Sequence, residues 1–99
     1  MNEREMLELA AKAAGQERSI AGDLWSNARG LLWNPLTDDG DALRLAVKLH
    51  LMVTIAEGTS YADHYHNTEP NIAEPHGDPY AATRRAITRA AAEIGRAMK

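Results

Sequence analysis

The stretch WNPLTDDGDALRLAVKLHLMVTI, residues Trp33 to Ile55, contains the clearest helix start in the chain and the clearest change of periodicity. Pro35 disfavours a helical conformation for the residue before it, so no helix continues through this point. Asp38 and Asp39 are of the residue types that cap helix N-termini, and their negative charge suits the positive end of the helix dipole. The pattern therefore predicts a helix over residues 38–49.

Two periods follow this helix start in succession. Apolar side chains first recur every three or four positions, which forms a stripe along one side of a helix. The stripe consists of Ala42, Leu45, Ala46 and Leu49. Leu43 and Val47 widen it, which predicts that this helix packs on more than one side. From Leu51 the period is two and β-branched residues are frequent, so we predict a strand over residues 51–57 that ends at Gly58.

Two further helices are indicated at the ends of the chain. Residues 2–14 have a helical apolar stripe with acidic residues early in the segment, and Gly15 is a typical residue just after a helix end. Asp78 followed by Pro79 combines an N-cap acid with a proline in the first turn. We therefore predict a helix over residues 79–98.

The remaining segments are less regular. Residues 16–34 mix turn formers with apolar residues and fit either a short helical turn or an irregular hairpin. After a turn at 58–60, the alternation over residues 61–66 fits a second, antiparallel strand. Residues 67–78 contain two prolines and no periodicity, which predicts a loop.

This order of elements predicts an α+β fold in one domain over residues 1–99, with helices packed on a small antiparallel sheet. A chain of 99 residues without phenylalanine, in which alanine supplies much of the apolar content, has a small core. Association would stabilise such a chain. We therefore expect a homo-oligomer.

Composition excludes several classes of protein. The chain has no cysteine, so it has neither disulfides nor thiolate metal sites. No apolar run approaches the length that spans a bilayer, and the N-terminus does not have the pattern of a signal peptide, so we expect a cytoplasmic protein without membrane contact. The net charge of −3 argues against general nucleic-acid binding. Residues 79–99 differ, because they carry five Lys or Arg residues against one Glu, a net charge of +4.

Two blocks resemble known proteins: WNPLTDDGDALRLAVKL (33–49) and DPYAATRRAITRAAAEIGRAM (78–98). They are similar to small uncharacterised proteins of tailed phages and proteobacterial prophages, and their pattern resembles the phage ABA sandwich domain. LELAAKAAG (7–15) matches more weakly. The resemblance implies a compact α/β/α unit and a phage or prophage origin, hence a location in the cytoplasm of the infected bacterial host. It implies no catalytic residues and no cofactor.

The arginines of the last predicted helix are the leading candidates for ligand binding. Arginine presents a planar fork that matches phosphate and carboxylate groups. We predict an anion site built from this helix and the middle of the chain, or else a solvated face that pairs with acidic residues of the same chain. The candidate ligand-binding residues are Arg84, Arg85, Arg89, Tyr61, Tyr65 and His66. Trp25 and Trp33 are predicted to be core or interface anchors and not ligand-stacking residues, because a buried tryptophan usually finds a partner for its indole N–H.

Two other clusters carry weaker signals. His64 and His66 lie two apart on a possible strand and could bind a metal ion, with His76, Asp63 or Glu74 completing the set. Solvent-facing histidines on an edge strand explain them more simply. Asp38, Asp39 and Asp41 could form a carboxylate cluster for Mg²⁺ or for acid–base chemistry, but helix capping accounts for all three. No nucleophile elbow, phosphate-binding glycine loop or zinc-protease helix is present, so we do not expect an enzyme.

Three functional hypotheses follow from the sequence. The first is a phage-encoded, non-enzymatic accessory protein that counteracts host defence by binding, in its sharpest form by sequestering an anionic nucleotide-type signal. The second is a protein–protein inhibitor or adaptor of a host or phage complex. The third is a metal-dependent phosphodiesterase that uses His64 and His66.

Overall fold

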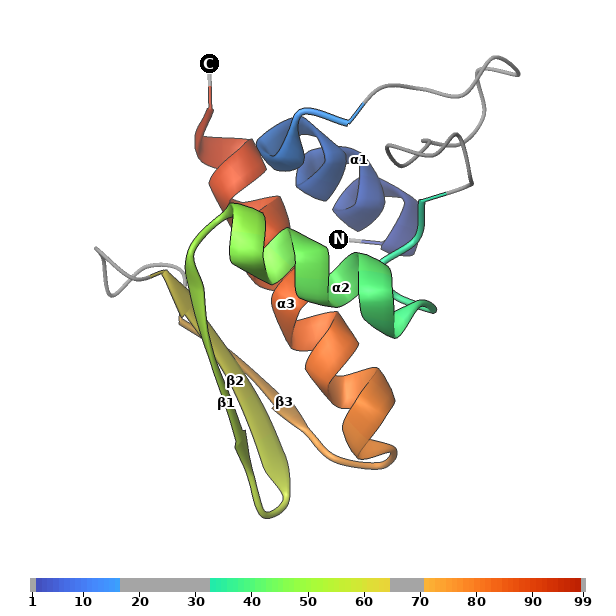
Figure 1. The fold of residues 1–99 in the computed structure, drawn as a ribbon, viewed down its shortest axis with the longest axis vertical. Helices are drawn as coiled ribbons and strands as arrows, with labels where there is room; N and C mark the ends of the chain where they lie inside the picture. Colours follow the sequence, from blue (N-terminus) through green and yellow to red (C-terminus); the bar gives the residue numbers. More distant parts are fainter. Residues whose placement is uncertain (1, 17–32, 65–70, 99) are drawn as a thin grey trace.

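The computed structural model describes residues 2–16, 33–64 and 71–98, which form three helices and a three-stranded antiparallel sheet (Figure 1). The elements in chain order are α1 (Glu3–Ala14), α2 (Asp39–Lys48), β1 (Leu51–Ala56), β2 (Thr59–His64), β3 (Asn71–Pro75) and α3 (Pro79–Ala97). The predicted α+β fold, with helices packed on a small antiparallel sheet, is confirmed.

Each helix begins after a residue of a capping type, whose side chain satisfies one of the free N–H groups of the first turn. The side chain of Asn2 accepts from the N–H of Glu5 at 2.8 Å, and Asp38 accepts from Asp41 N–H at 2.7 Å. The carboxylate of Asp78 accepts from the N–H of Tyr80. The helices therefore begin within one residue of the positions that their sequences predict.

The strands differ more from prediction. Thr59 already pairs with Ala56, so the turn is shorter than the predicted 58–60 and β2 begins before Tyr61. Gly58 supplies the left-handed conformation of this turn, with φ of 83°. The loop predicted over 67–78 was wrong for Asn71–Pro75, which forms β3. This strand has one large aliphatic residue, Ile72, and exists because it pairs with β2 along its whole length, a tertiary effect that local sequence does not encode.

The described helices cover one face of the sheet. On that face Leu51, Ala62 and Ile72 contact Ala86 and Ala90 of α3. The side chains of the other face are exposed at Met52, Thr54, Tyr61 and Ala73. Alternation along the strands therefore separates a packed side of the sheet from an open side.

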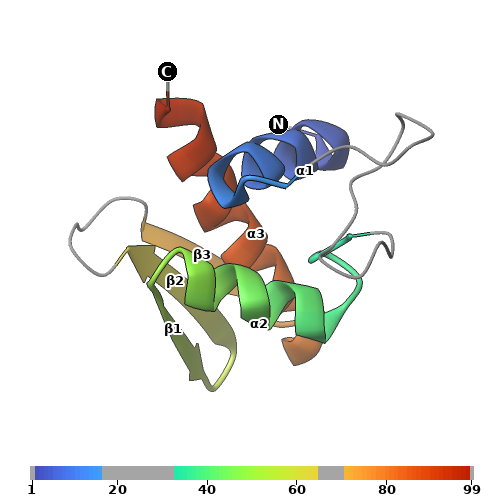
Figure 2. The same cartoon turned by 45° about the horizontal axis from the view of Figure 1, so that its top comes forward.

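Helix α3 is the centre of the molecule. It contacts all three strands, α2 and α1, while α1 packs on the side of α3 away from the sheet (Figure 2). The resemblance implies an α/β/α unit. In the described residues the sheet forms one outer layer, α2 and α3 form the middle layer, and α1 packs on α3 from the other side. The contacts within this unit rest mainly on alanines, with Trp33 buried among them at 4% exposure.

No helix in the described ranges is long and apolar enough to cross a bilayer.

Candidate functional site

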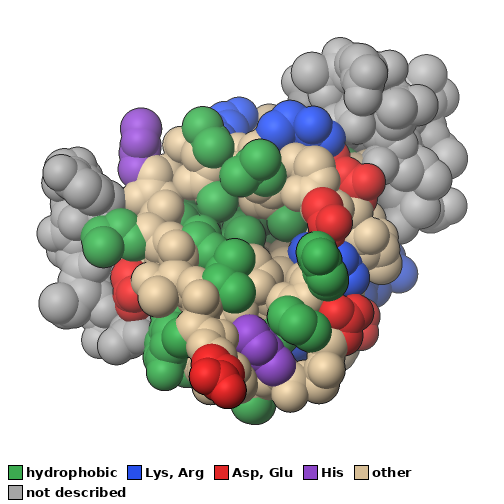
Figure 3. Space-filling model, turned by 60° about the horizontal axis from the view of Figure 1, so that its bottom comes forward, with side chains coloured by type: hydrophobic (Ala, Val, Ile, Leu, Met, Phe, Trp, Pro, Cys, Tyr) green, Lys and Arg blue, Asp and Glu red, His purple; other side chains and the backbone are tan. Residues whose placement is uncertain are grey.

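A groove of about 690 Å³ opens between the first turns of α2, the N-terminal half of α3 and the C-terminal half of β1. Figure 3 shows this face of the molecule, with green apolar side chains around and inside a hollow. The groove is lined by Ala42, Leu43, Ala46, Val53, Ile55, Pro79, Tyr80, Thr83 and Ile87, together with Asp39 and Arg84. Its walls are therefore mainly apolar, as in most binding pockets.

Small residues at the base and large residues at the rim produce this hollow. Ala42 and Ala46 of α2 are buried, but their side chains are too short to fill the space between the two helices. Leu43 and Tyr80 are exposed by 64% and 69%. Large contiguous apolar patches on the surface of a protein usually mark a binding site.

A tight connection places β1 beside α2. Only Leu49 and His50 separate the two elements, and His50 has a φ of 56°, in the left-handed region that few non-glycine residues adopt. The chain therefore reverses sharply, and Val53 and Ile55 of the strand come to line the same groove as α2.

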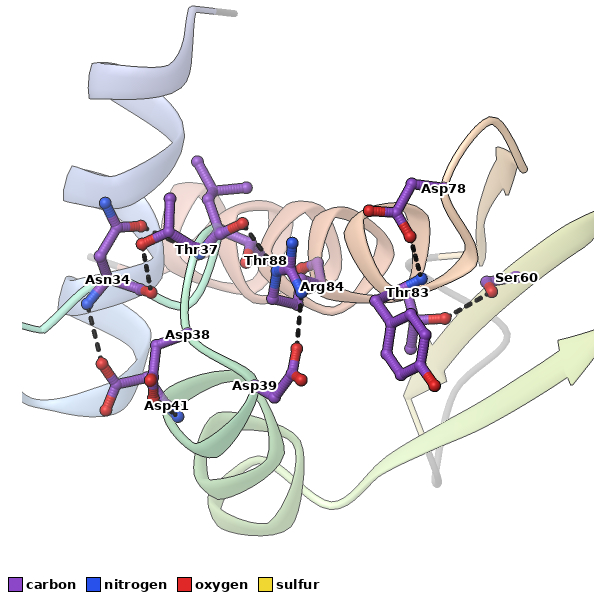
Figure 4. A network of polar contacts seen from close by, with 12 residues as sticks. Asn34, Thr37, Asp38, Asp39, Asp41, Ser60, Asp78, Thr83, Arg84 and Thr88 are labelled. Carbon is purple, nitrogen blue, oxygen red and sulfur yellow. Dashed lines mark hydrogen bonds and ion pairs between the residues drawn. The ribbon is translucent and has the colours of Figure 1, made fainter.

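Arg84 closes one end of the groove. Its Nη1 donates to Asp39 at 2.6 Å and its Nε donates to the carbonyl oxygen of Leu36 at 2.9 Å (Figure 4). These bonds connect the second turn of α3 to the start of α2 and to the turn before it. They fix the distance between the two walls, and they leave Arg84 with a carboxylate partner already in place.

A second polar cluster joins the hairpin to α3. The hydroxyl of Ser60 lies 2.7 Å from Thr83 Oγ1 and 2.7 Å from His76 Nε2. Ser60 is completely buried, so its oxygen is closed to substrates. We interpret the Ser–His pair as a structural link beneath the groove and not as a nucleophile with its base.

The structure brings two of the three predicted arginines together, Arg85 and Arg89, and places Arg84 apart from them. Arg84 faces α2, whereas Arg85 and Arg89 both pair with Glu74 of β3, Arg85 at 3.4 Å. Tyr61 points to the open face of the sheet, away from these arginines. Tyr65 and His66 lie outside the described residues. Each of the three arginines thus has an acidic partner within the chain, as the alternative interpretation of this helix predicted.

The other candidate residues that the structure describes belong to different elements of the fold. Trp33 is buried in the core and offers no contact surface, and Trp25 lies outside the described residues. His64 is the last residue of β2, while His76 contacts Ser60. Within residues 2–16, 33–64 and 71–98, no three His, Cys, Asp or Glu side chains are placed to hold a metal ion.

The aspartates at the start of α2 have three different roles. Capping was predicted for all three, but only Asp38 is the N-cap, and Asp39 pairs with Arg84. Asp41 is buried at 2% exposure and accepts from the N–H of Asn34 at 3.0 Å and from Arg44 at 2.8 Å. This carboxylate therefore holds the Asn-Pro turn against the helix, a role that its position in the first turn did not indicate.

One signal for the groove is present in the sequence, an apolar residue of α2 that lies outside the main stripe of the helix. Leu43 and Val47 predicted a helix packed on more than one side, but both are exposed, Val47 by 66%. Apolar residues outside the main stripe of a helix indicate either a second internal contact or a surface for a partner. Nothing in their spacing distinguishes the two.

Comparison with models of protein families gave no match, and comparison with curated proteins and with solved structures gave none either. The function is therefore inferred from the geometry.

Proposed function

We propose that this chain is a non-enzymatic binding protein, an inhibitor or adaptor, that receives apolar side chains of a partner protein in the groove between α2, α3 and β1. The observation that carries the proposal is the combination of a mainly apolar hollow with large exposed side chains at its rim. Apolar and aromatic anchors seated in such hollows dominate the binding energy of protein interfaces.

A protein partner fits this groove better than an anionic small molecule. Arg84 is the cationic residue among the groove residues, and a phosphate would have to displace Asp39 from it. A partner's apolar side chains would instead contact Leu43, Ile55 and Tyr80 without breaking an existing ion pair. Grooves beside helices commonly bind the apolar face of a partner segment in this way.

The resemblance to phage and prophage proteins supplies the biological setting of the proposal. It favours a phage-encoded accessory protein that acts in the cytoplasm of the infected host, against host defence or within a phage complex. Such a role needs occupation of a partner surface and no chemical step.

Sequestration of an anionic nucleotide-type signal is a second candidate, supported by one observation. Arg85 and Arg89 share Glu74, so two positive charges face one negative charge, and their side chains are 41% and 39% exposed. This arrangement leaves one positive charge in excess on a surface that a phosphate can reach.

Alanine truncation in the groove tests the first candidate. After a partner has been identified by affinity capture from infected cells, Leu43→Ala and Tyr80→Ala are each expected to weaken its binding by at least about tenfold, which is ~1.4 kcal/mol. Met98→Ala is the matched control, because Met98 is an exposed apolar residue at the other end of α3. Isothermal titration calorimetry with the purified partner measures these affinities.

The same variants separate the two candidates. If the captured partner binds the two groove variants as tightly as the unchanged chain, the groove is not its site. For the second candidate, a nucleotide that raises the melting temperature should lose this effect in Arg85→Ala and Arg89→Ala and keep it in Leu43→Ala. A nucleotide effect that both arginine variants retain would exclude the arginine pair.

A further inference from the structure

The two outer strands of the sheet differ in how their edges are protected. The strand order is β1-β2-β3, so β1 and β3 are the edge strands. Native sheets guard exposed edges with prolines, charges or bulges. Strand β3 contains Pro75, which has no N–H, and the charged Glu74. Its edge is therefore poorly suited to pairing with another strand.

Strand β1 has none of these protections. Its sequence, LMVTIA, contains no charge, proline or glycine. It pairs with β2 through six consecutive residue pairs, from Leu51↔His64 to Ala56↔Thr59, without a bulge. In the part of the chain that the structure describes, no strand pairs with its outer side. A regular, uncharged edge of this kind is a template for pairing with another chain.

Large apolar side chains lie on and beside this edge. Met52 on the open face and Ile55 on the helix face are exposed by more than half, and α2, which packs on β1, exposes Val47. The edge is thus apolar on both faces of the sheet as well as unpaired. Pairing would satisfy the backbone groups of the edge and bring Met52 and Ile55 beside side chains of a second strand.

We propose that β1 pairs in antiparallel fashion with β1 of a second copy of this chain, so that two three-stranded sheets become one continuous sheet of two molecules. Because β1 has no charged side chain, two copies of it can pair without placing like charges opposite each other. Its pattern is also symmetric, because aliphatic residues occupy positions 51, 53 and 55. Both properties favour an isologous pair, in which the same surface of each molecule forms the contact.

In this pair the two-fold axis lies midway between Val53 of one copy and Val53 of the second. That register sets Val53 opposite Val53 of the second copy, and Leu51 opposite its Ile55. All of these residues point to the helix face, so the apolar layer beneath the helices continues across the contact. If the register slipped by one residue, the helix face of one copy would adjoin the open face of the other, which carries Met52 and Thr54. The apolar layer would then be interrupted, so the register is specified.

The composition of the core adds a reason for pairing. The largest fully buried side chains are those of Met6, Thr88, Pro35 and Ser60, and most other buried residues in the described ranges are alanines. So thin a core stabilises a chain only modestly.

Because Val53 and Ile55 also line the groove, pairing would place the grooves of the two copies on the same face of one sheet.

Single cysteines test the pairing directly, because the chain has none of its own. The unchanged chain is expected to sediment as a dimer, and Val53→Cys should form a disulfide-linked dimer nearly completely under mild oxidation. Ile55→Cys is the matched control on the same strand and face. In this register the two cysteines at position 55 lie about 13 Å apart along the strands. A disulfide spans a Cα separation of at most ~7 Å, so they cannot be linked.

A charge on the edge supplies the second test. Thr54 is exposed, so Thr54→Lys should leave the circular dichroism spectrum unchanged while the dimer is lost in sedimentation velocity. The proposal is overturned if the unchanged chain sediments as a monomer at every concentration, if Ile55→Cys cross-links as fast as Val53→Cys, or if a folded Thr54→Lys variant remains a dimer.

Discussion

Single residues determine how closely the elements of this chain approach one another. Gly95 does so for the two longest helices, because a Cβ at this position would lie 1.9 Å from the carbonyl oxygen of Leu9. The obstacle is the backbone of α1, which cannot rotate away as a side chain could. The contact between α1 and α3 therefore requires glycine for its lack of a side chain, since Gly95 has no left-handed φ.

Gly95→Ala is expected to lower the free energy of unfolding by about 1–3 kcal/mol, because α1 must move away from α3 and lose packing. Urea denaturation followed by circular dichroism measures this change. Gly77→Ala is the control, since a Cβ at Gly77 meets nothing within 4 Å and its φ is not left-handed. Equal stability of the two variants would show that the helices do not cross as closely as described.

At the scale of elements, the fold was predictable where chemistry acts locally. The N-caps of α2 and α3, the proline after Asp78 and the change of period at Leu51 each act on the neighbouring backbone. The third strand was not predictable, because Asn71–Pro75 becomes a strand only through its pairing with β2. Local patterns identify elements that are stable by themselves and miss those that the fold creates.

The candidate site was predicted less well than the elements. The sequence places Arg84, Arg85 and Arg89 on one helix, but their partners come from α2 and β3 and direct them to different sides. The groove depends on the distance between Ala42 of α2 and Ile55 of β1, which no spacing in the sequence encodes. Leu43 alone indicated it, as an apolar residue outside the main stripe.

Glu74 attaches β3 to α3, and its removal should lower the free energy of unfolding more than removal of either arginine. Glu74→Ala leaves two arginines without a carboxylate, whereas Arg85→Ala leaves Glu74 paired with Arg89. We expect Glu74→Ala to lower the free energy of unfolding by ~1 kcal/mol, and Arg85→Ala by less, because the pairs are partly exposed. Thermal unfolding of both variants checks this order. A larger loss for Arg85→Ala would mean that its aliphatic stem, and not its charge, holds the strand.

At the scale of the whole molecule, the features that suit association lie along one strand. Strand β1 contributes Val53 and Ile55 to the groove and presents the unprotected edge of the sheet. The opposite end of the molecule, where α1 covers α3, is held by close helix packing around Gly95. One end of the molecule is thus internally packed, while the other leaves apolar groups for a partner to cover.

If two chains share a sheet through β1, stability must depend on protein concentration. Unfolding then separates two molecules, so each tenfold rise in concentration adds about 1.4 kcal/mol per dimer. For two chains of this length that corresponds to a rise of a few degrees in melting temperature. Differential scanning calorimetry over a series of concentrations measures the slope, with Thr54→Lys as the control that should show none. Parallel slopes for the two proteins would mean that association occurs elsewhere on the surface, whereas a slope confined to the unchanged chain would attribute its extra stability to the edge of β1.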